Sequence, residues 1–102
     1  MLELRPICEN CAVPLPPDAT DAMICSFECT FCASCVAGVL QNVCPNCGSG
    51  FTSRPVRPSR NWKDENYLGA HPPTSIRRHE PVDPGEHARF ATEIGEIPPH
   101  ER

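Results

Sequence analysis

The chain has 102 residues and a formal charge of −4, and eight of its residues are cysteine. Cysteine at this frequency is typical of small scaffolds that disulfides or metal ions hold together. No apolar run approaches the roughly 20 residues of a membrane-spanning helix, and no basic region precedes an apolar stretch at the N-terminus, so we expect no secretory signal. The predicted location is the cytoplasm, where clustered cysteines are more often metal ligands or redox thiols than disulfides.

The two halves of the chain differ in composition. All eight cysteines lie between Cys8 and Cys47, whereas eight of the thirteen prolines lie in the second half. We therefore predict a two-zinc module over residues 1–53, a basic, proline-rich linker or docking arm over 54–82, and a short amphipathic helix with a frayed tail over 83–102.

The cysteine-rich module is acidic. Residues 1–53 contain one arginine and five acidic side chains, and eight thiolates around two Zn²⁺ ions would take their formal charge from −4 to −8. Such a surface repels phosphate backbones, which proteins normally bind through lysine and arginine. We therefore expect no nucleic-acid binding by the module itself.

Two Cys-x2-Cys pairs begin and end the cysteine-rich region. The first knuckle is Cys8-Glu9-Asn10-Cys11 and the second is Cys44-Pro45-Asn46-Cys47, followed by Gly48. A gap of two residues lets both sulfurs of a tight turn bind one tetrahedral ion. Gly48 suits the left-handed conformation that often follows the second ligand, and Asn10 is the residue of the first knuckle that best tolerates a positive φ.

Between the knuckles the pattern predicts a hairpin and a short helix. Residues 23–27 can pair as a strand with residues 30–31, which places Cys25 and Cys29 near one end of the hairpin. From Ser34 onward, apolar side chains recur at helical spacing, so Cys32 and Cys35 would lie at the helix N-terminus. The apolar positions of that helix are Val36, Val39 and Leu40. Spacing alone leaves open whether the cysteine pairs share ions sequentially, in a nested order or interleaved.

Other uses of the cysteines fit less well. A ferredoxin-type cluster that starts at Cys29-x2-Cys32-x2-Cys35 would need a cysteine at Val39. A thioredoxin-like thiol needs a βαβ framework, and a nucleophilic cysteine needs a nearby base. All four histidines lie in the second half, where we expect them at the surface. We therefore predict no catalytic residue and no enzymatic activity.

The segment from Ile24 to Cys35 resembles the centre of a RING finger, with Phe31 as the aromatic residue before the fifth ligand and Cys29 in place of the usual histidine. The resemblance implies a small, zinc-stabilised α+β fold of the RING-like or treble-clef cross-brace type, with a short hairpin, one short helix and an extended proline-rich C-terminal arm. It further implies that the first ion (site 1) is held by Cys8, Cys11, Cys32 and Cys35, and the second (site 2) by Cys25, Cys29, Cys44 and Cys47.

The same stretch is also similar to a small bacterial family of unknown function. Its members carry MLELRP, a CxxC, CSFECTFCxxC, CPNCG and a basic RPxRP stretch, and residues 1–58 follow that pattern almost throughout. The resemblance implies a metal-binding fold and a bacterial source, but no activity. Ubiquitin-ligase activity is not expected, because Asn10, Val39 and Gly48 depart from the partner-binding positions of RING ligases.

The tail offers one basic segment and one helix. Four cations could contact nucleic acid, namely Arg54, Arg57, Arg60 and Lys63, but we favour a solvated linker or an arm that folds back onto the acidic module. Asp83 and Pro84 form a helix start, and Gly95 can end that helix. Its apolar face would be formed by His87, Phe90, Ala91 and Ile94.

These patterns favour a zinc protein that acts as a non-catalytic protein-interaction or adaptor module. Two alternatives remain open. One is a nucleic-acid-associated zinc protein that uses the segment from Arg54 to Lys63, and the other is a thiol redox or metal-buffering protein. No membrane partner is expected, and the sequence does not determine the oligomeric state.

Overall fold

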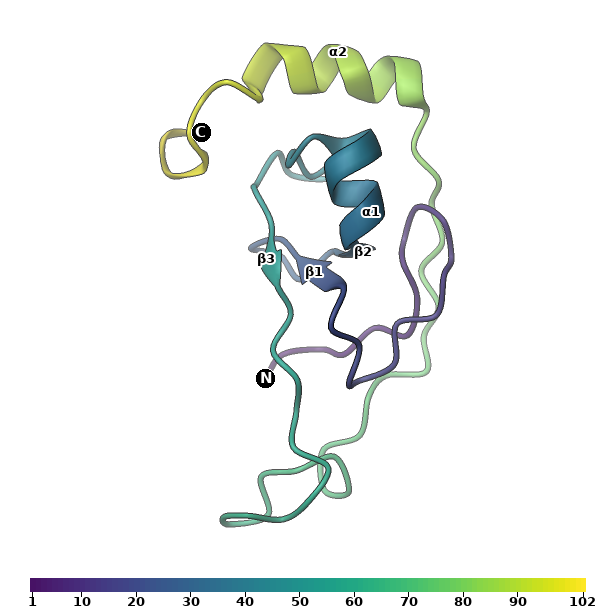
Figure 1. Ribbon diagram of the computed structural model, residues 1–102, viewed down its shortest axis with the longest axis vertical. Coiled ribbons are helices and arrows are strands. Elements are labelled where there is room, and N and C mark those ends of the chain that lie inside the picture. The colour runs from purple at the N-terminus through teal and green to yellow at the C-terminus, as the bar shows by residue number, and fades with distance from the viewer.

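The structure, a computed structural model, describes residues 1–102. Three short strands form one sheet, a short helix follows it, and a longer helix lies across that short helix (Figure 1). The elements are β1 (Ala22–Ile24), β2 (Thr30–Cys32), α1 (Ala33–Cys35), the π-helical turn η1 (Val36–Leu40), β3 (Thr52–Ser53), α2 (Pro84–Ile94) and the 3-10 turn η2 (Pro99–Glu101). The predicted small α+β class is confirmed.

The sheet has the order β2-β1-β3, and both pairings are antiparallel. The predicted hairpin is present as β1 and β2, with Met23 opposite Phe31. The backbone N–H of Cys25 donates to the carbonyl of Cys29 at 3.2 Å, so the turn brings these two cysteines to the same end of the hairpin. The third strand is too short to leave a pattern in the sequence.

The predicted helix runs from Ala33 to Leu40, but only its first turn is α-helical. It widens into the π-helical η1, which contains Gly38. Glycine weakens an α-helix by about 1 kcal/mol relative to alanine, and π-helical geometry occurs mostly as single turns of this kind. Gln41 ends the helix in the left-handed conformation, with φ of 54°. Val36 and Leu40 are buried beneath it, as the helical spacing predicts.

The core lies between the sheet, the short helix and the N-terminal segment. Its fully buried side chains include Leu4, Leu15, Phe31, Leu40 and Val43. The rings of Phe31 and Phe51 meet edge to face with centroids 5.4 Å apart, a favourable aromatic geometry. Two large apolar side chains of the module lie outside this core, namely Val13, which is 40% exposed, and Phe27, which is 70% exposed.

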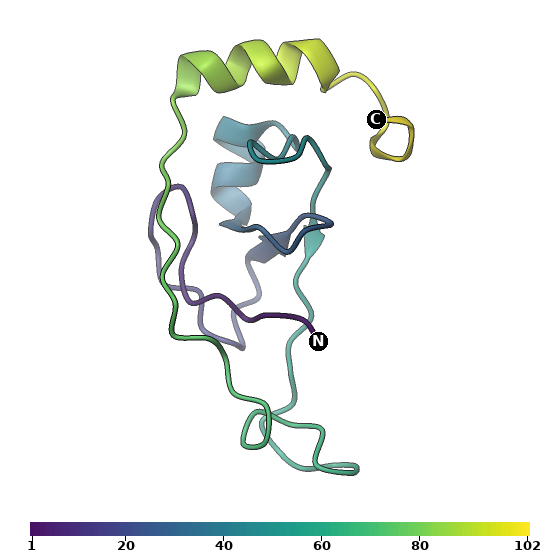
Figure 2. The same ribbon diagram turned by 180° about the vertical axis from the view of Figure 1, so that it is seen from behind.

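The arm does not extend freely into solvent. Residues after β3 run away from the sheet, turn, and return along the opposite side of the module next to the first knuckle (Figure 2). On this return path, backbone N–H groups of the arm donate to the module. Thr74 N–H donates to the Leu4 carbonyl at 3.2 Å and Glu80 N–H to the Glu9 carbonyl at 2.8 Å. The arm therefore adds hydrogen bonds to the module along its length.

Helix α2 begins with the predicted cap, because the Asp83 carboxylate accepts a hydrogen bond from the backbone N–H of Glu86 at 3.0 Å. Its apolar face rests on the end of the module: a Cβ added at Gly48 would lie 3.0 Å from Ile94 Cδ1 and 3.5 Å from the Phe90 ring. This contact closes the fold above η1. None of the helices has the length and apolar character needed to cross a membrane.

The frayed C-terminal tail that we expected is not seen. The Arg102 guanidinium donates from Nη1 to the carbonyls of Asn42 and Gly48, at 2.9 and 3.0 Å. Its Nε donates to the Ile97 carbonyl at 2.9 Å. The sequence gave no signal of the contacts with Asn42 and Gly48, because these backbone carbonyls lie 60 and 54 residues before Arg102.

Candidate metal centre

The first cysteine group joins the first knuckle to the start of the short helix. The Sγ atoms of this group, which lie within 4.8 Å of one another, belong to Cys8, Cys11, Cys32 and Cys35. Cys32 ends β2 and Cys35 ends α1, one helical turn later. The sequence therefore delivers these two sulfurs to one point because a strand passes directly into a helix there.

The same backbone hydrogen bond closes both knuckles. In the first, Ala12 N–H donates to the Cys8 carbonyl at 2.9 Å, and in the second, Gly48 N–H donates to the Cys44 carbonyl at 2.8 Å. Ala12 and Gly48 both have positive φ, 64° and 82°. The residue after the second cysteine thus takes the left-handed conformation in each knuckle. We expected Asn10 to take it in the first knuckle, and that expectation is wrong.

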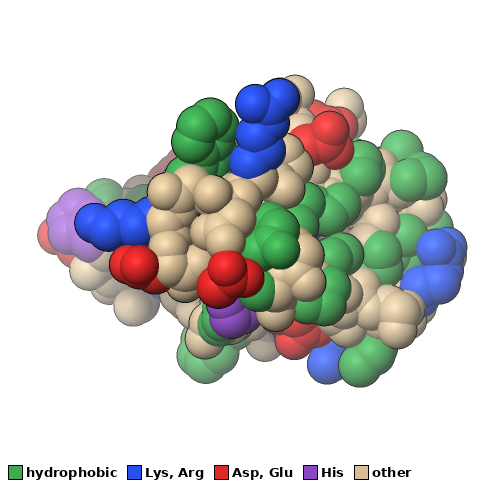
Figure 3. All heavy atoms as spheres, turned by 90° about the horizontal axis from the view of Figure 1, so that it is seen from below, with side chains coloured by type: hydrophobic (Ala, Val, Ile, Leu, Met, Phe, Trp, Pro, Cys, Tyr) green, Lys and Arg blue, Asp and Glu red, His purple; other side chains and the backbone are tan.

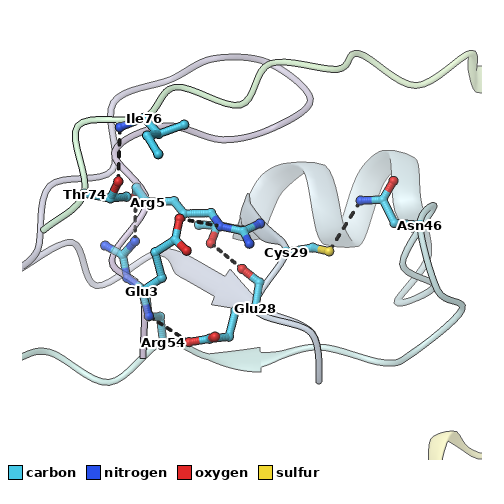
Figure 4. Close-up of polar contacts among 9 residues, drawn as sticks. Glu3, Arg5, Glu28, Cys29, Asn46, Arg54, Thr74 and Ile76 are labelled. Atoms are coloured by element: carbon cyan, nitrogen blue, oxygen red, sulfur yellow. Dashed lines mark hydrogen bonds and ion pairs between the residues drawn. The ribbon is translucent and has the colours of Figure 1, made fainter. Parts of the chain in front are cut away.

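The second cysteine group joins the end of β1 to the second knuckle. Its Sγ atoms within 4.8 Å of one another belong to Cys25, Cys44 and Cys47. Cys29, predicted for the same site, lies beside the group rather than inside that limit, and its sulfur accepts a hydrogen bond from Asn46 Nδ2 at 3.4 Å (Figure 4). The structure therefore brings three of the predicted site-2 cysteines together and places the fourth next to them.

The spacing of the sulfurs fits zinc. Four sulfurs at the zinc–thiolate distance of about 2.3 Å form a tetrahedron with edges of about 3.8 Å. The Sγ atoms of Cys11 and Cys32 are 3.8 Å apart, and so are those of Cys25 and Cys47. The two groups also interleave along the chain, because the first group combines the first and third cysteine pairs, and the second combines Cys25 with the fourth pair. Each group can therefore hold one metal ion, with donors that suit Zn²⁺.

When no cation is bound, burial and hydrogen bonding determine the pKa values of the thiols. Burial raises the pKa of Cys25 to about 11 and that of Cys35 to about 12, and it raises the pKa of Cys44 further. Burial also opposes ionisation of Cys47, but hydrogen bonds with Ser49 outweigh it and lower the pKa of that thiol. Most of these groups therefore hold protons that a bound cation has to displace.

Amide donors surround the sulfurs. Asn10 Nδ2 donates to Cys35 Sγ at 3.3 Å, and Phe27 N–H donates to Cys25 Sγ at 3.4 Å. Hydrogen bonds from N–H groups stabilise a negatively charged acceptor, so they favour the thiolate form that binds zinc. We did not predict Asn10 and Asn46 as parts of the sites, although each occupies the same position before the second cysteine of its knuckle.

Two of the four predicted basic residues hold the arm to the module. Arg54 is 3% exposed, and its guanidinium donates to the carbonyls of Arg5, Leu15 and Pro16 at 2.9, 3.2 and 2.8 Å. Figure 4 shows Arg54 beside the N-terminal segment. Arg57 donates to the carbonyls of Leu2 and His71, at 2.8 and 2.7 Å. Their charges are therefore used inside the protein.

The remaining two cations do not form a positive face. The guanidinium of Arg60 lies 5.9 Å from the ring centre of Trp62, and Lys63 is exposed beside Asp64. Seen from below, basic side chains are scattered among acidic and apolar ones rather than gathered into one patch (Figure 3). This arrangement gives no support to a phosphate-binding surface on the arm, because such surfaces concentrate lysine and arginine.

We expected the histidines at the surface, and for His87 that expectation is wrong. His87 is 5% exposed, and its Nε2 lies 2.9 Å from the Leu40 carbonyl at the end of η1. His79 Nε2 lies 3.2 Å from the Asn10 carbonyl in the first knuckle. Both side chains bind backbone of the module, and neither belongs to a cysteine group. They are therefore contacts of the arm rather than metal ligands.

Comparison with known proteins agrees with the sequence pattern. An uncharacterized protein of Rhizobium meliloti (strain 1021) is 61% identical over 59 residues, which cover 58% of this chain and 70% of that protein. No solved structure matches the chain. The DUF1272 family, described as a protein of unknown function, matches residues 1–57. The predicted resemblance to a small family of unknown function is thus confirmed, and the chain belongs to the DUF1272 family.

Proposed function

We propose that the chain binds two structural Zn²⁺ ions and serves as a non-catalytic protein-interaction or adaptor module in a reducing compartment such as the cytoplasm. One observation carries the zinc part of this proposal. The sulfurs of each of two interleaved cysteine groups lie within 4.8 Å of one another, and one pair in each group is 3.8 Å apart, the edge of a zinc–thiolate tetrahedron. The proposed ligands are those of the two predicted sites, with Cys29 completing the second.

Zinc would supply the stability that this small core lacks. The module has only a few fully buried apolar side chains, of which Phe31 is the largest. Domains of this size rarely bury enough apolar surface to offset the entropy of the chain. A structural zinc ion contributes roughly 10–16 kcal/mol of apparent binding free energy at neutral pH. Two such ions would therefore decide whether the module folds.

The ligand count argues against catalysis. Catalytic zinc keeps an open position for water or substrate, whereas structural zinc has four protein ligands. Two sites of four cysteines use every thiol of the chain, so none remains as a nucleophile. The imidazoles of His79 and His87 contact backbone carbonyls, where they serve as anchors for the arm.

Exposed aromatic side chains support the interaction role. Phe27 lies in the turn between β1 and β2 and is 70% exposed, and Trp62 on the arm is 73% exposed. Large aromatic side chains are favoured anchors of protein interfaces, because they bury much area with few rotatable bonds. Phe27 belongs to the family segment, so it is the better candidate for a contact that family members share.

Metal analysis tests the zinc part. Full-length protein purified without added metal should contain two zinc ions per chain by elemental analysis. Removal of zinc by a strong chelator should collapse the amide dispersion of residues 1–53 in a heteronuclear NMR spectrum. An iron content, or a dispersed spectrum after complete zinc removal, would contradict the proposal.

Capture from a bacterial lysate tests the adaptor part. Zinc-loaded wild-type protein should retain a defined partner that Phe27→Ser loses and that Ser34→Ala, an exposed substitution on the same module, still binds. A thiol reagent added to the zinc-loaded chain separates this role from redox or metal buffering. Slow modification supports a structural site, whereas rapid modification with zinc release would favour the buffering function.

A further inference from the structure

The two knuckles share an asparagine that touches a sulfur from another segment. Asn10 Nδ2 donates to Cys35 Sγ at 3.3 Å. Asn46 Nδ2 donates to Cys29 Sγ at 3.4 Å (Figure 4). Asn10 thus holds Cys35, which follows the hairpin, against the first knuckle. Asn46 holds Cys29, which lies at the end of the hairpin turn, against the second knuckle. The two asparagines are matched in position and in the atom that they contact.

Only Asn46 reaches the other site. The same Nδ2 that contacts Cys29 also donates to Glu9 Oε1 at 2.8 Å, and Glu9 lies between the two cysteines of the first knuckle. Asn10 instead uses its Oδ1 to accept from the backbone N–H of Val82 in the arm, at 3.0 Å. One hydrogen bond therefore connects the knuckle of site 1 with the knuckle of site 2.

Glu9 is buried and fixed by backbone hydrogen bonds, so loss of its contact with Asn46 would be costly. It is 6% exposed, its backbone N–H donates to the Thr30 carbonyl at 3.0 Å, and its own carbonyl accepts from Glu80 at 2.8 Å. Its Oε2 is buried without a hydrogen-bond partner. If Asn46 moved away, both carboxylate oxygens would be buried and unpaired, which is strongly unfavourable. The position of Asn46 therefore depends on the position of the first knuckle.

Cys29 is the cysteine whose placement needs this help. The other proposed ligands of site 2 already lie within 4.8 Å of one another, whereas Cys29 lies beside them and is held by Asn46. A first knuckle folded around its ion fixes Glu9, Glu9 fixes Asn46, and Asn46 presents the Cys29 sulfur to the second group. Glu9 and Asn46 are positioning residues in this chain of contacts.

We propose that the Glu9–Asn46 hydrogen bond couples the two metal sites, so that an ion in one site raises the affinity of the other. This inference rests on the two-zinc function proposed above. Because coupling between binding sites is reciprocal, the effect is the same whichever site fills first. The expected signature is a protein that passes from metal-free to two-zinc with little of the one-zinc form between.

Native mass spectrometry of the full chain, titrated with zinc against a competing chelator, measures the three forms. In the wild type, the one-zinc form should stay below the share expected for independent sites. Glu9→Ala and Asn46→Ala should raise the share of that form about two- to sixfold, the change expected when a coupling in the usual range is lost. Glu9→Gln keeps the Oε1 acceptor and should behave as the wild type. Asn10→Ala, the matched control, should weaken site 1 and leave the coupling factor unchanged.

Cadmium-113 NMR gives a readout that a general loss of stability would not produce. Glu9→Ala should shift the resonance of site 2 although the substitution lies in the knuckle of site 1, whereas Asn10→Ala should shift the resonance of site 1 alone. If Glu9→Ala shifts the resonance of site 2 and raises the one-zinc share while Glu9→Gln does neither, the coupling is supported. Equal effects of both variants would overturn it, because the charge rather than the contact would then matter.

The result that overturns the inference differs from the one that overturns the function. The coupling is overturned, and the two-zinc function left intact, if every variant binds two zinc ions and the one-zinc share of Glu9→Ala and Asn46→Ala equals that of the wild type. Fewer than two zinc ions in the wild type itself would remove the function.

Discussion

The cysteine-rich module and the C-terminal arm are held in different ways. The module gathers seven of its eight cysteines into two groups, with Cys29 beside the second, and its secondary structure is limited to a few short elements. The C-terminal arm, taken together with α2 and the tail as residues 54–102, has no cysteine. It is fixed to the module by side chains that bind backbone carbonyls, chiefly Arg54, Arg57, His87 and Arg102. Under the proposed two-zinc function, the module depends on metal, and the arm depends on the module.

This difference orders the expected effects of substitutions. A change in a cysteine group should unfold both regions, because the acceptors of the arm are carbonyls whose positions the module fixes. A change in an arm contact should release the arm and leave the module with its zinc. The predictions below move from the first kind to the second.

The largest effect is expected from Cys44→Ser. Cys44 is fully buried in the second group, and its loss removes one of four proposed ligands of that ion. Since a structural zinc contributes roughly 10 kcal/mol or more, we expect destabilisation on the order of 5 kcal/mol and one zinc ion fewer per chain. Denaturant unfolding and elemental analysis measure these quantities. Ser34→Ala, exposed on the same module, should change neither.

Acid should release the metal before it affects anything else. Burial raises the thiol pKa of Cys25 to about 11 and that of Cys35 to about 12, so protons compete strongly with zinc and the zinc affinity falls as the pH falls. The raised pKa values alone would act in the opposite direction. They would favour a metal-free fold below the ordinary thiol pKa of 9.0, and that contribution would be lost as the pH rises towards 11–12.

The pH dependence of unfolding therefore identifies the source of stability. We expect the folded fraction, followed by circular dichroism, to fall between about pH 6 and pH 4 together with zinc release, as protons displace zinc from its thiolates. Stability that is unchanged in acid and lost only in strong alkali would show that the fold does not rest on zinc.

Arg54→Met tests the main anchor of the arm. The substitution removes hydrogen bonds to the carbonyls of Arg5, Leu15 and Pro16. The Pro16 carbonyl keeps the backbone N–H of Ala19, whereas those of Arg5 and Leu15 lose their donor. We expect a loss of about 3 kcal/mol in the free energy of unfolding, with both zinc ions retained. The control is Arg60→Met, where the guanidinium is exposed and the change should stay within about 0.5 kcal/mol.

His87→Ala tests the contact between α2 and the short helix. The side chain is buried, and its Nε2 meets the Leu40 carbonyl at 2.9 Å. We expect faster amide hydrogen exchange throughout α2 and a loss of about 1–2 kcal/mol, while amides of β1 and β2 keep their protection. Equal acceleration in the sheet would mean that the arm and the module unfold as one unit.

The smallest effects on stability are expected from alanine substitutions at two glycines, Gly48 and Gly38. A Cβ added at Gly48 would meet Ile94 Cδ1 at 3.0 Å, and the residue has φ of +82°, whereas a Cβ at Gly38 would meet nothing within 4 Å. Gly48→Ala should destabilise the chain by about 1 kcal/mol, and Gly38→Ala should stabilise it by about 0.5–1 kcal/mol. Thermal unfolding of the zinc-loaded variants checks both signs.

Residue patterns were sufficient for the elements that depend on local chemistry. The hairpin around Cys25 and Cys29, the short helix after Cys32 and the capped helix at Asp83 are present where they were predicted. Each follows from features within a few residues: a turn, an apolar spacing or a cap. The grouping of cysteines came from resemblance alone, since spacing left the pairing open.

What the sequence could not reveal are contacts between distant side chains and backbone. Arg54 and Arg57 form part of a basic segment that also fits an exposed patch, and only the folded chain shows that their acceptors are carbonyls. Asn10 and Asn46 were visible as polar residues inside the knuckles. Their shared position before a cysteine was the one signal that pointed to a role beside the sulfurs.

The central claim is that two all-cysteine zinc sites hold the module, with Cys29 completing the second. Zinc X-ray absorption on the full chain tests it most directly. We expect two zinc ions per chain and four sulfurs around each at about 2.3 Å, with no lighter ligand. Cys29→Ser should replace one sulfur in one site alone. A wild-type spectrum with an average of fewer than four sulfurs per zinc, or with nitrogen or oxygen in the shell, would contradict the account.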